Sequence, residues 1–168
     1  LYPAKEIGGD LYDFFIKDDR LFFAIGDVSG KGVPASLLMA VTRSHFRSVA
    51  STLKDPAKII ESMNKALAET NETNMFVTIF TGILDLRTGV MSYSNAGHNP
   101  PLLLGPSGKV TRMNPDPNLP IGLFDTFEYS KAEITLEPCT TLLLYTDGIT
   151  EAEDRDKQLY GEQRLIQS

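Results

Sequence analysis

Three aspartates stand at the ends of apolar segments, where acidic side chains often carry chemistry. Asp10 and Asp27 lie near the two ends of the stretch GGDLYDFFIKDDRLFFAIGDVSG (residues 8–30), and Asp147 follows the apolar run TLLLYT. A carboxylate in apolar surroundings needs a shared proton, a basic partner or a bound cation. Ligand sets made only of oxygen select hard cations such as Mg²⁺ or Mn²⁺. The three acids therefore favour a divalent metal site, and a proton-sharing pair stays open as an alternative.

The spacing of Asp10 and Asp27 places them opposite each other in a β-hairpin. If Asp18 and Asp19 form a two-residue turn, the opposed pairs run outward from the turn and bring Asp10 opposite Asp27. The same face carries the pairs Tyr12–Ile25, Phe14–Phe23 and Ile16–Leu21. Because these pairs are apolar, we expect this face to lie in the core. A shifted register, with one aspartate on the surface, is the alternative.

The elements expected after the hairpin form a helical block and then a strand block. Pro34 suits the start of a first helix, and Asp55 caps a second that begins at Pro56. The first helix has one apolar stripe, made of Leu38, Val41, His45 and Val49. Strands are expected over residues 76–86, 90–97, 101–105, 110–113, 127–136 and 140–148, and a last helix over 157–168. Helices segregated from antiparallel hairpins indicate an α+β layered sandwich.

Composition and motif spacing argue against several other classes of protein. The net charge of −6 argues against a nucleic-acid surface, and no apolar run is long enough to span a membrane. A single cysteine excludes an internal disulfide and suggests a cytoplasmic location, and with two histidines it makes a zinc cage hard to assemble. The segment GDVSGKG lacks the spacing of a phosphate-binding Walker loop, and Cys139 lacks the arginine that a cysteine phosphatase needs. His45 is expected to be a packed histidine. His98, in SNAGHNPP, is expected to fix a tight turn, and a functional role for it stays open.

Several motifs in collinear order resemble one phosphatase family. They are PAKEIGGDLYDFF, FFAIGDVSGKGVPASLLMA, FVTIFTGILDLRTGVMSYSNAGHNPPLLL, LPIGLF and LLLYTDGITEA. Together they resemble the PPM (protein phosphatase 2C-like) metal-dependent serine/threonine phosphatases, and more narrowly their bacterial sporulation II E-type branch. The resemblance implies a four-layer α-β-β-α sandwich, in which two antiparallel sheets are flanked by helices. It also implies a site for two divalent cations, Mn²⁺ or Mg²⁺, at one edge.

The resemblance assigns roles to particular residues. It implies that Asp10, Asp27 and Asp147 are catalytic metal ligands, that Asp27 bridges the two metals, and that the backbone carbonyl of Val28 is a further ligand. The family usually supplies another metal-binding aspartate from a late strand, in a motif like DDxT, and residues 1–168 end before such a strand. We therefore expect a single phosphatase domain, truncated at both ends, in which one metal lacks a ligand.

The function implied by the resemblance is hydrolysis of phosphoserine or phosphothreonine on a regulatory protein by attack of a metal-bound water. The expected substrate is a phosphorylated anti-sigma-factor antagonist of the STAS type, with no nucleic acid and no membrane contact. The oligomeric state stays open, with a homodimer as one option. Two alternatives also stay open: a degenerate, non-catalytic module that binds phosphoproteins, and a hydrolase of small phosphate esters.

Overall fold

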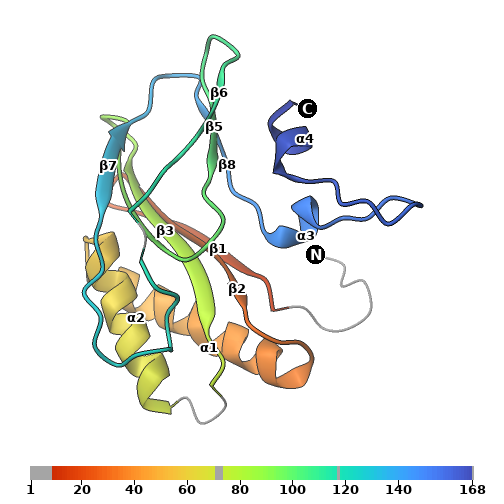
Figure 1. Ribbon diagram of the computed structural model, residues 1–168. Helices are drawn as coiled ribbons and strands as arrows, with labels where there is room; N and C mark the ends of the chain where they lie inside the picture. The colour runs from red at the N-terminus through yellow and green to blue at the C-terminus, as the bar shows by residue number, and fades with distance from the viewer. Residues whose placement is uncertain (1–8, 71–73, 117, 168) are drawn as a thin grey trace.

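Two antiparallel sheets and four helices make up the fold (Figure 1). The computed structural model describes residues 9–70, 74–116 and 118–167. The strands are β1 (Leu11–Lys17), β2 (Arg20–Val28), β3 (Val77–Asp85), β4 (Val90–Ala96), β5 (Leu102–Leu104), β6 (Val110–Arg112), β7 (Ala132–Thr135) and β8 (Thr141–Leu143). The helices are α1 (Val33–Ala50), α2 (Pro56–Thr70), α3 (Asp147–Thr150) and α4 (Glu162–Gln167).

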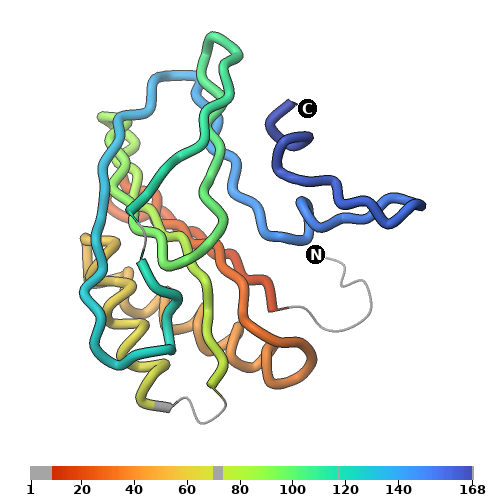
Figure 2. The backbone as a smooth tube through the Cα atoms, viewed as in Figure 1, coloured from red at the N-terminus to blue at the C-terminus, as the bar shows by residue number. Residues whose placement is uncertain are grey.

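The sheets are stacked, and the two long helices cover one of them. The larger sheet has the strand order β1-β2-β3-β4-β7, and the smaller has the order β6-β5-β8. Helices α1 and α2 lie on one face of the larger sheet, and the smaller sheet lies on its other side, as the backbone trace in Figure 2 also shows. The predicted α+β sandwich is therefore confirmed. In the part of the chain that the structure describes, no helix is both long and apolar enough to span a bilayer.

Two apolar layers result from this stacking. The layer between the helices and the larger sheet contains Phe22 and Phe46, and the layer between the two sheets contains Phe23, Phe80 and Leu103. Neighbouring residues of a strand point to opposite faces, so Phe22 and Phe23 enter different layers. Strand β2 is thus buried on both faces, which gives the end of the strand a fixed position between helices and sheet.

The predicted hairpin register is confirmed. Strands β1 and β2 pair antiparallel from Leu11 opposite Gly26 to Lys17 opposite Arg20. Asp18 and Asp19 both have positive φ, at 50° and 56°, as a tight two-residue hairpin turn requires. In this register Asp10 and Asp27 are the next pair beyond the ladder.

The predicted burial of one face of β1 is wrong. Tyr12, Phe14 and Ile16 are 57%, 61% and 67% exposed, although Phe23 on the neighbouring strand is buried. Strand β1 is the edge of the larger sheet, and the described strands of the smaller sheet leave this part of it uncovered. The buried face of β1 is instead the one that carries Leu11 and Asp13 toward the helices.

The starts of α1 and α2 follow the sequence, whereas the apolar stripe of α1 and the start of α4 differ from the prediction. Asp55 caps α2, because its Oδ1 accepts a hydrogen bond from the N–H of Ala57 at 2.9 Å. The buried side chains of α1 are Ala35, Thr42, Phe46 and Ala50, so the predicted stripe is rotated, and its Val41 is 57% exposed. Helix α4 begins later than predicted, since Gly161 has a φ of 77° and ends the preceding loop.

An ion pair between a buried aspartate and a half-exposed arginine joins α1 to the edge strand. Asp13 is only 4% exposed, and its carboxylate accepts two hydrogen bonds from Arg47, at 2.6 and 2.7 Å. Arg47 also donates to the carbonyl of Phe14 at 3.1 Å, while Asp13 accepts from the N–H of the same residue. These contacts satisfy backbone groups of an edge strand, which otherwise invite pairing with another chain. The pair thus fixes β1 on the helix, three residues from Asp10.

We expect Arg47→Ala to destabilise the protein clearly more than Arg43→Ala does, because it leaves the buried Asp13 carboxylate without its hydrogen-bonding partner. Arg43→Ala is the matched control: Arg43 is about as exposed as Arg47 but comes only within 3.5 Å of the same carboxylate, so its loss should cost less than about 1 kcal/mol. Urea unfolding measures both changes. Equal losses for the two variants would contradict the assigned role.

The same pair predicts a pH dependence. Hydrogen bonding by Arg47 is the largest influence on the Asp13 carboxyl and lowers its pKa. A carboxyl with a lowered pKa stabilises the fold above its unfolded pKa of about 4, and this contribution disappears as the pH falls through the folded value. The stability difference between wild type and Arg47→Ala should therefore be full at pH 7 and shrink at pH values well below 4.

Candidate metal centre

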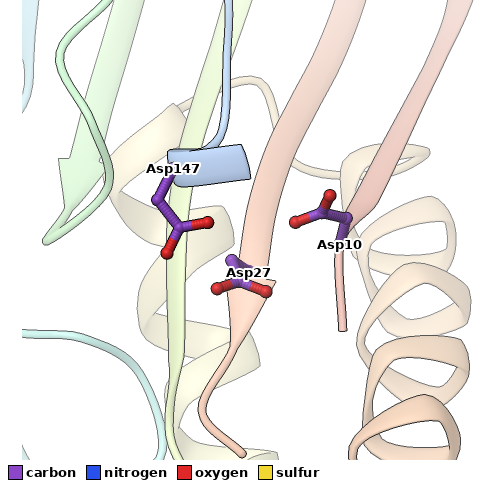
Figure 3. A group of neighbouring side chains, drawn as sticks. All are labelled: Asp10, Asp27 and Asp147. Carbon is purple, nitrogen blue, oxygen red and sulfur yellow. The ribbon is translucent and has the colours of Figure 1, made fainter. Parts of the chain in front are cut away.

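The three aspartates singled out by the sequence meet at one end of the sandwich. Each offers a carboxylate oxygen, and these oxygens lie within 4.8 Å of one another. Figure 3 shows the side chains converging from three places: Asp10 just before β1, Asp27 near the end of β2, and Asp147 at the start of α3. Asp10 and Asp27 are partly buried, and Asp147 is exposed. The site therefore lies at the rim of the molecule, open to solvent on one side.

Burial and the mutual repulsion of these acids raise the pKa of Asp27. Burial first, and then the charges of Asp10 and Asp147, raise the pKa of its carboxyl to about 6, although a hydrogen bond from the backbone of Val28 opposes them. A carboxyl with this pKa is mostly ionised at pH 7, so the cluster keeps negative charge there. Among the described residues no ion pair involves any of the three acids. Of the three remedies for clustered acids, a bound cation suits this site best.

The backbone at Gly9 leaves space for such a cation. A Cβ at this position would lie 2.9 Å from the Val28 carbonyl oxygen and 3.1 Å from Asp27 Oδ1. The glycine before Asp10 thus allows the strand to approach the acids closely, and any side chain would crowd them. The Val28 carbonyl, the fourth ligand that the family resemblance implies, lies on this same side of the cluster. Acidic oxygens, an adjacent carbonyl and no intervening side chain form a donor set that hard divalent cations accept.

One residue near the site was missed by the sequence prediction. Thr146 Oγ1 donates a hydrogen bond to Asp10 Oδ2 at 3.2 Å, which ties the segment after β8 to the segment before β1. Asp147 was predicted to end a strand in a turn, but it opens the short helix α3. The signal available in the sequence was the adjacency of Thr146 and Asp147, although nothing there indicated that the hydroxyl would reach Asp10.

His98 has a different role from the predicted one. The turn after β4 is fixed by Asn95, whose side chain accepts from the N–H of His98 and donates to its carbonyl, both at 2.8 Å. The imidazole instead contacts Thr78 Oγ1 at 3.1 Å and the carbonyl oxygen of Tyr145 at 3.2 Å. Burial lowers the pKa of His98 to about 4, so the ring is neutral at physiological pH. The other histidine, His45, is partly buried on α1 and is not among the candidate ligands.

A groove of about 560 Å³ runs beside the acids. Its walls are the exposed face of β1, part of β2 and the segment from Leu144 to Ile149. Asp10 and Thr146 lie on its lining, and the remaining walls are mainly apolar. The site is thus bordered by a surface wide enough to contact a segment of another molecule.

Several known proteins are similar to this chain in sequence. The family model described as "Stage II sporulation protein E (SpoIIE)" matches residues 17–168. The phosphoserine phosphatase RsbU of Bacillus subtilis is 28% identical over 149 residues, which cover 89% of this chain and 44% of RsbU. The chain spans less than half the length of the curated relatives that it matches.

Solved structures share the fold. The structure of the RsbU and RsbW domains of Rv1364c from Mycobacterium tuberculosis superposes with a TM-score of 0.83 at 27% identity, covering 98% of this chain and 45% of that one. The PP2C phosphatase domain of SpoIIE from Bacillus subtilis gives a TM-score of 0.74 at 21% identity, covering 95% of this chain and 51% of that one. These structures share the fold of this chain, and the family model that matches residues 17–168 shows that the chain belongs to the SpoIIE family.

Proposed function

We propose that this domain is a protein phosphatase that uses two divalent cations, Mn²⁺ or Mg²⁺, to hydrolyse phosphoserine or phosphothreonine. The observation that carries the proposal is the meeting of three carboxylates within 4.8 Å, from segments that the sequence places far apart. When bound there, divalent cations stabilise the charge on phosphoryl oxygens and lower the pKa of water. The name of RsbU, a phosphoserine phosphatase, supports the same reaction for this chain.

The residues of the chain prepare the site for this chemistry in distinct ways. Asp27, whose pKa is raised by burial and by its acidic neighbours, lies between the other two acids in Figure 3 and would contact both cations. Asp10 and Asp147 would each hold one side, with the Val28 carbonyl as a further donor. Thr146 orients the Asp10 carboxylate through its hydrogen bond. Three carboxylates carry less charge than two dications, so the loaded site would keep positive charge for a phosphoryl group.

The position of the site favours a protein substrate. Asp147 is exposed and the acids lie at the rim, whereas sites for small molecules usually enclose most of their ligand. The open groove beside them offers apolar surface to a polypeptide that carries the phosphate. We propose a cytoplasmic, phosphorylated regulatory protein of the STAS type as the substrate, in line with the family resemblance and with the Rsb names of the relatives.

Phosphate release tests this proposal. We expect the protein to release phosphate from a phosphoserine-bearing STAS-domain protein in the presence of Mn²⁺, to stop when EDTA is added, and to act far more slowly on p-nitrophenyl phosphate. Faster turnover of the small ester would favour a small-molecule hydrolase. Binding of the phosphoprotein and Mn²⁺ without any phosphate release would contradict catalysis and favour the non-catalytic binding module.

A further inference from the structure

The candidate metal centre combines residues from two different sheets. Asp27 belongs to the larger sheet and Asp10 precedes its edge strand, while Asp147 follows β8 of the smaller sheet. Strands within a sheet are held in register by their ladder of hydrogen bonds, but no ladder joins β8 to β2. The distance between Asp147 and Asp27 therefore depends on contacts between the sheets.

His98 makes such a contact, next to the segments that carry Asp27 and Asp147. Its ring is 6% exposed and lies between two backbone segments. On one side it contacts Thr78, which is the partner of Asp27 in the β2–β3 ladder. On the other side it contacts the carbonyl oxygen of Tyr145, two residues before Asp147. One side chain thus links the backbone just before Asp147 to the strand partner of Asp27.

The chemistry of the contacts fixes how the ring must be protonated. A carbonyl oxygen can only accept, so Nε2 carries the hydrogen and donates it to Tyr145. In a neutral ring Nδ1 is then an acceptor, and the hydroxyl of Thr78 donates to it. That hydroxyl also lies 3.3 Å from the carbonyl oxygen of Asp27, but the 3.1 Å contact with His98 is the shorter of the two. Both ring nitrogens are therefore used, each in a role that the other determines.

The backbone of His98 is held in place by a further hydrogen-bond network. Asn95 is 5% exposed, and its side chain is hydrogen-bonded to both the N–H and the carbonyl of His98. Asn118 in turn donates to the carbonyl oxygen of Asn95 at 3.1 Å. The His98 ring is therefore held in one place, because buried hydrogen-bond networks are rigid when every member is satisfied.

We propose that His98 is a positioning residue, which holds the end of β8 against β3 through its Nε2–H bond to Tyr145 and so sets the place of Asp147 relative to Asp27. This role rests on the proposed function in one respect, namely that the acids bind divalent cations. Groups that orient metal ligands typically change metal affinity by about 10–100-fold when they are removed.

Two substitutions separate the two ring contacts. His98→Gln can place an amide N–H near the position of Nε2 and keep the donor to Tyr145, whereas His98→Asn can keep an acceptor for Thr78 but is too short to reach Tyr145. By calorimetric titration with Mn²⁺, we expect His98→Asn to bind about 10–100-fold more weakly than wild type and His98→Gln to lose less than about 5-fold. In thermal unfolding without metal, both variants should have a lower Tm than wild type, by similar amounts, since each loses one hydrogen bond of the ring.

A control variant distinguishes positioning from general stability. Asn118→Ala removes buried hydrogen bonds from the same network but none to the segment after β8, so it should lower the Tm and leave Mn²⁺ affinity near that of wild type. Equal Mn²⁺ affinity in wild type and His98→Asn, or an equal loss in the Asn and Gln variants, would overturn the role of His98 alone. Wild-type protein that binds no Mn²⁺ would contradict the proposed function as well.

Discussion

Asp27→Asn is expected to abolish Mn²⁺-dependent phosphate release and, at the same time, to make the metal-free protein more stable. The activity should fall to below roughly one thousandth of wild type, which corresponds to about 4 kcal/mol of lost transition-state stabilisation. The gain in stability follows from the removal of a charge that burial and two neighbouring carboxylates oppose. Phosphate release and urea unfolding at pH 7.5 measure the two effects.

The sign of the stability effect follows from proton linkage. The folded, metal-free protein holds a proton on Asp27 with a pKa of about 6, above the ordinary value of 3.8. Its stability therefore falls as the pH rises from about 4 through 6, by roughly 3 kcal/mol for a shift of this size. At pH 7.5 this penalty is complete in wild type and absent in Asp27→Asn, so the variant should be more stable by that order.

Asp18→Asn provides the matched control. Asp18 is exposed in the hairpin turn at a φ of 50°, a conformation that asparagine also tolerates. This variant should unfold within about 0.5 kcal/mol of wild type and keep full activity. If Asp27→Asn instead destabilises the metal-free protein and keeps Mn²⁺-dependent turnover, the assignment of Asp27 as a metal ligand is wrong.

Mn²⁺ is expected to raise the melting temperature of the wild-type protein by about 5–11 °C when its concentration is 100 times the dissociation constant. Binding to the native state alone stabilises by about 2.7 kcal/mol at that concentration, and each kcal/mol shifts the Tm of a domain of this size by about 2–4 °C. Differential scanning calorimetry with Mn²⁺ and after addition of EDTA measures the shift and its reversal.

The same titration on variants locates the cation. Asp10→Asn and Asp147→Asn should each reduce the shift, and Asp27→Asn should remove most of it. A full shift in the Asp27 variant would mean that Mn²⁺ binds elsewhere, for example at the exposed acidic loop around Asp154. In that case the cluster of three acids would not be the main cation site.

The gathering of Asp10 and Asp27 was predictable because a hairpin is a local structure. The turn at Asp18 and Asp19 sets the register, and every later pair follows from it. The cap at Asp55 was predictable for the same reason, since the hydrogen bond to Ala57 spans two residues. Asp147 was assigned to the site from its sequence motif and from the family resemblance.

The burial of β1 was not predictable from alternation alone. Both faces of the hairpin carry large apolar residues, and which face is covered depends on how far the second sheet extends over an edge strand. The polar Asp13 marks the buried face, against the usual rule, because Arg47 reaches it from a helix 34 residues away. A charge partner at such a separation leaves no local signal in the sequence.

The supports of the site were hidden for the same physical reason. His98 contacts residues that are 20 and 47 positions away, and Thr146 contacts Asp10 across 136 positions. The contacts that involve Tyr145 and Thr146 exist only once the two sheets have stacked. Residue types and strand ends therefore indicated which acids form the candidate cation site, whereas the groups that hold those acids in place required the folded structure.

Anomalous X-ray scattering from crystals soaked in Mn²⁺ tests the central claim most directly. The account predicts Mn²⁺ peaks in contact with the carboxylates of Asp10, Asp27 and Asp147, and the loss of these peaks in Asp27→Asn crystals soaked in the same way. Crystals saturated with Mn²⁺ that show no peak at these carboxylates, with the side chains turned apart toward solvent, would contradict it.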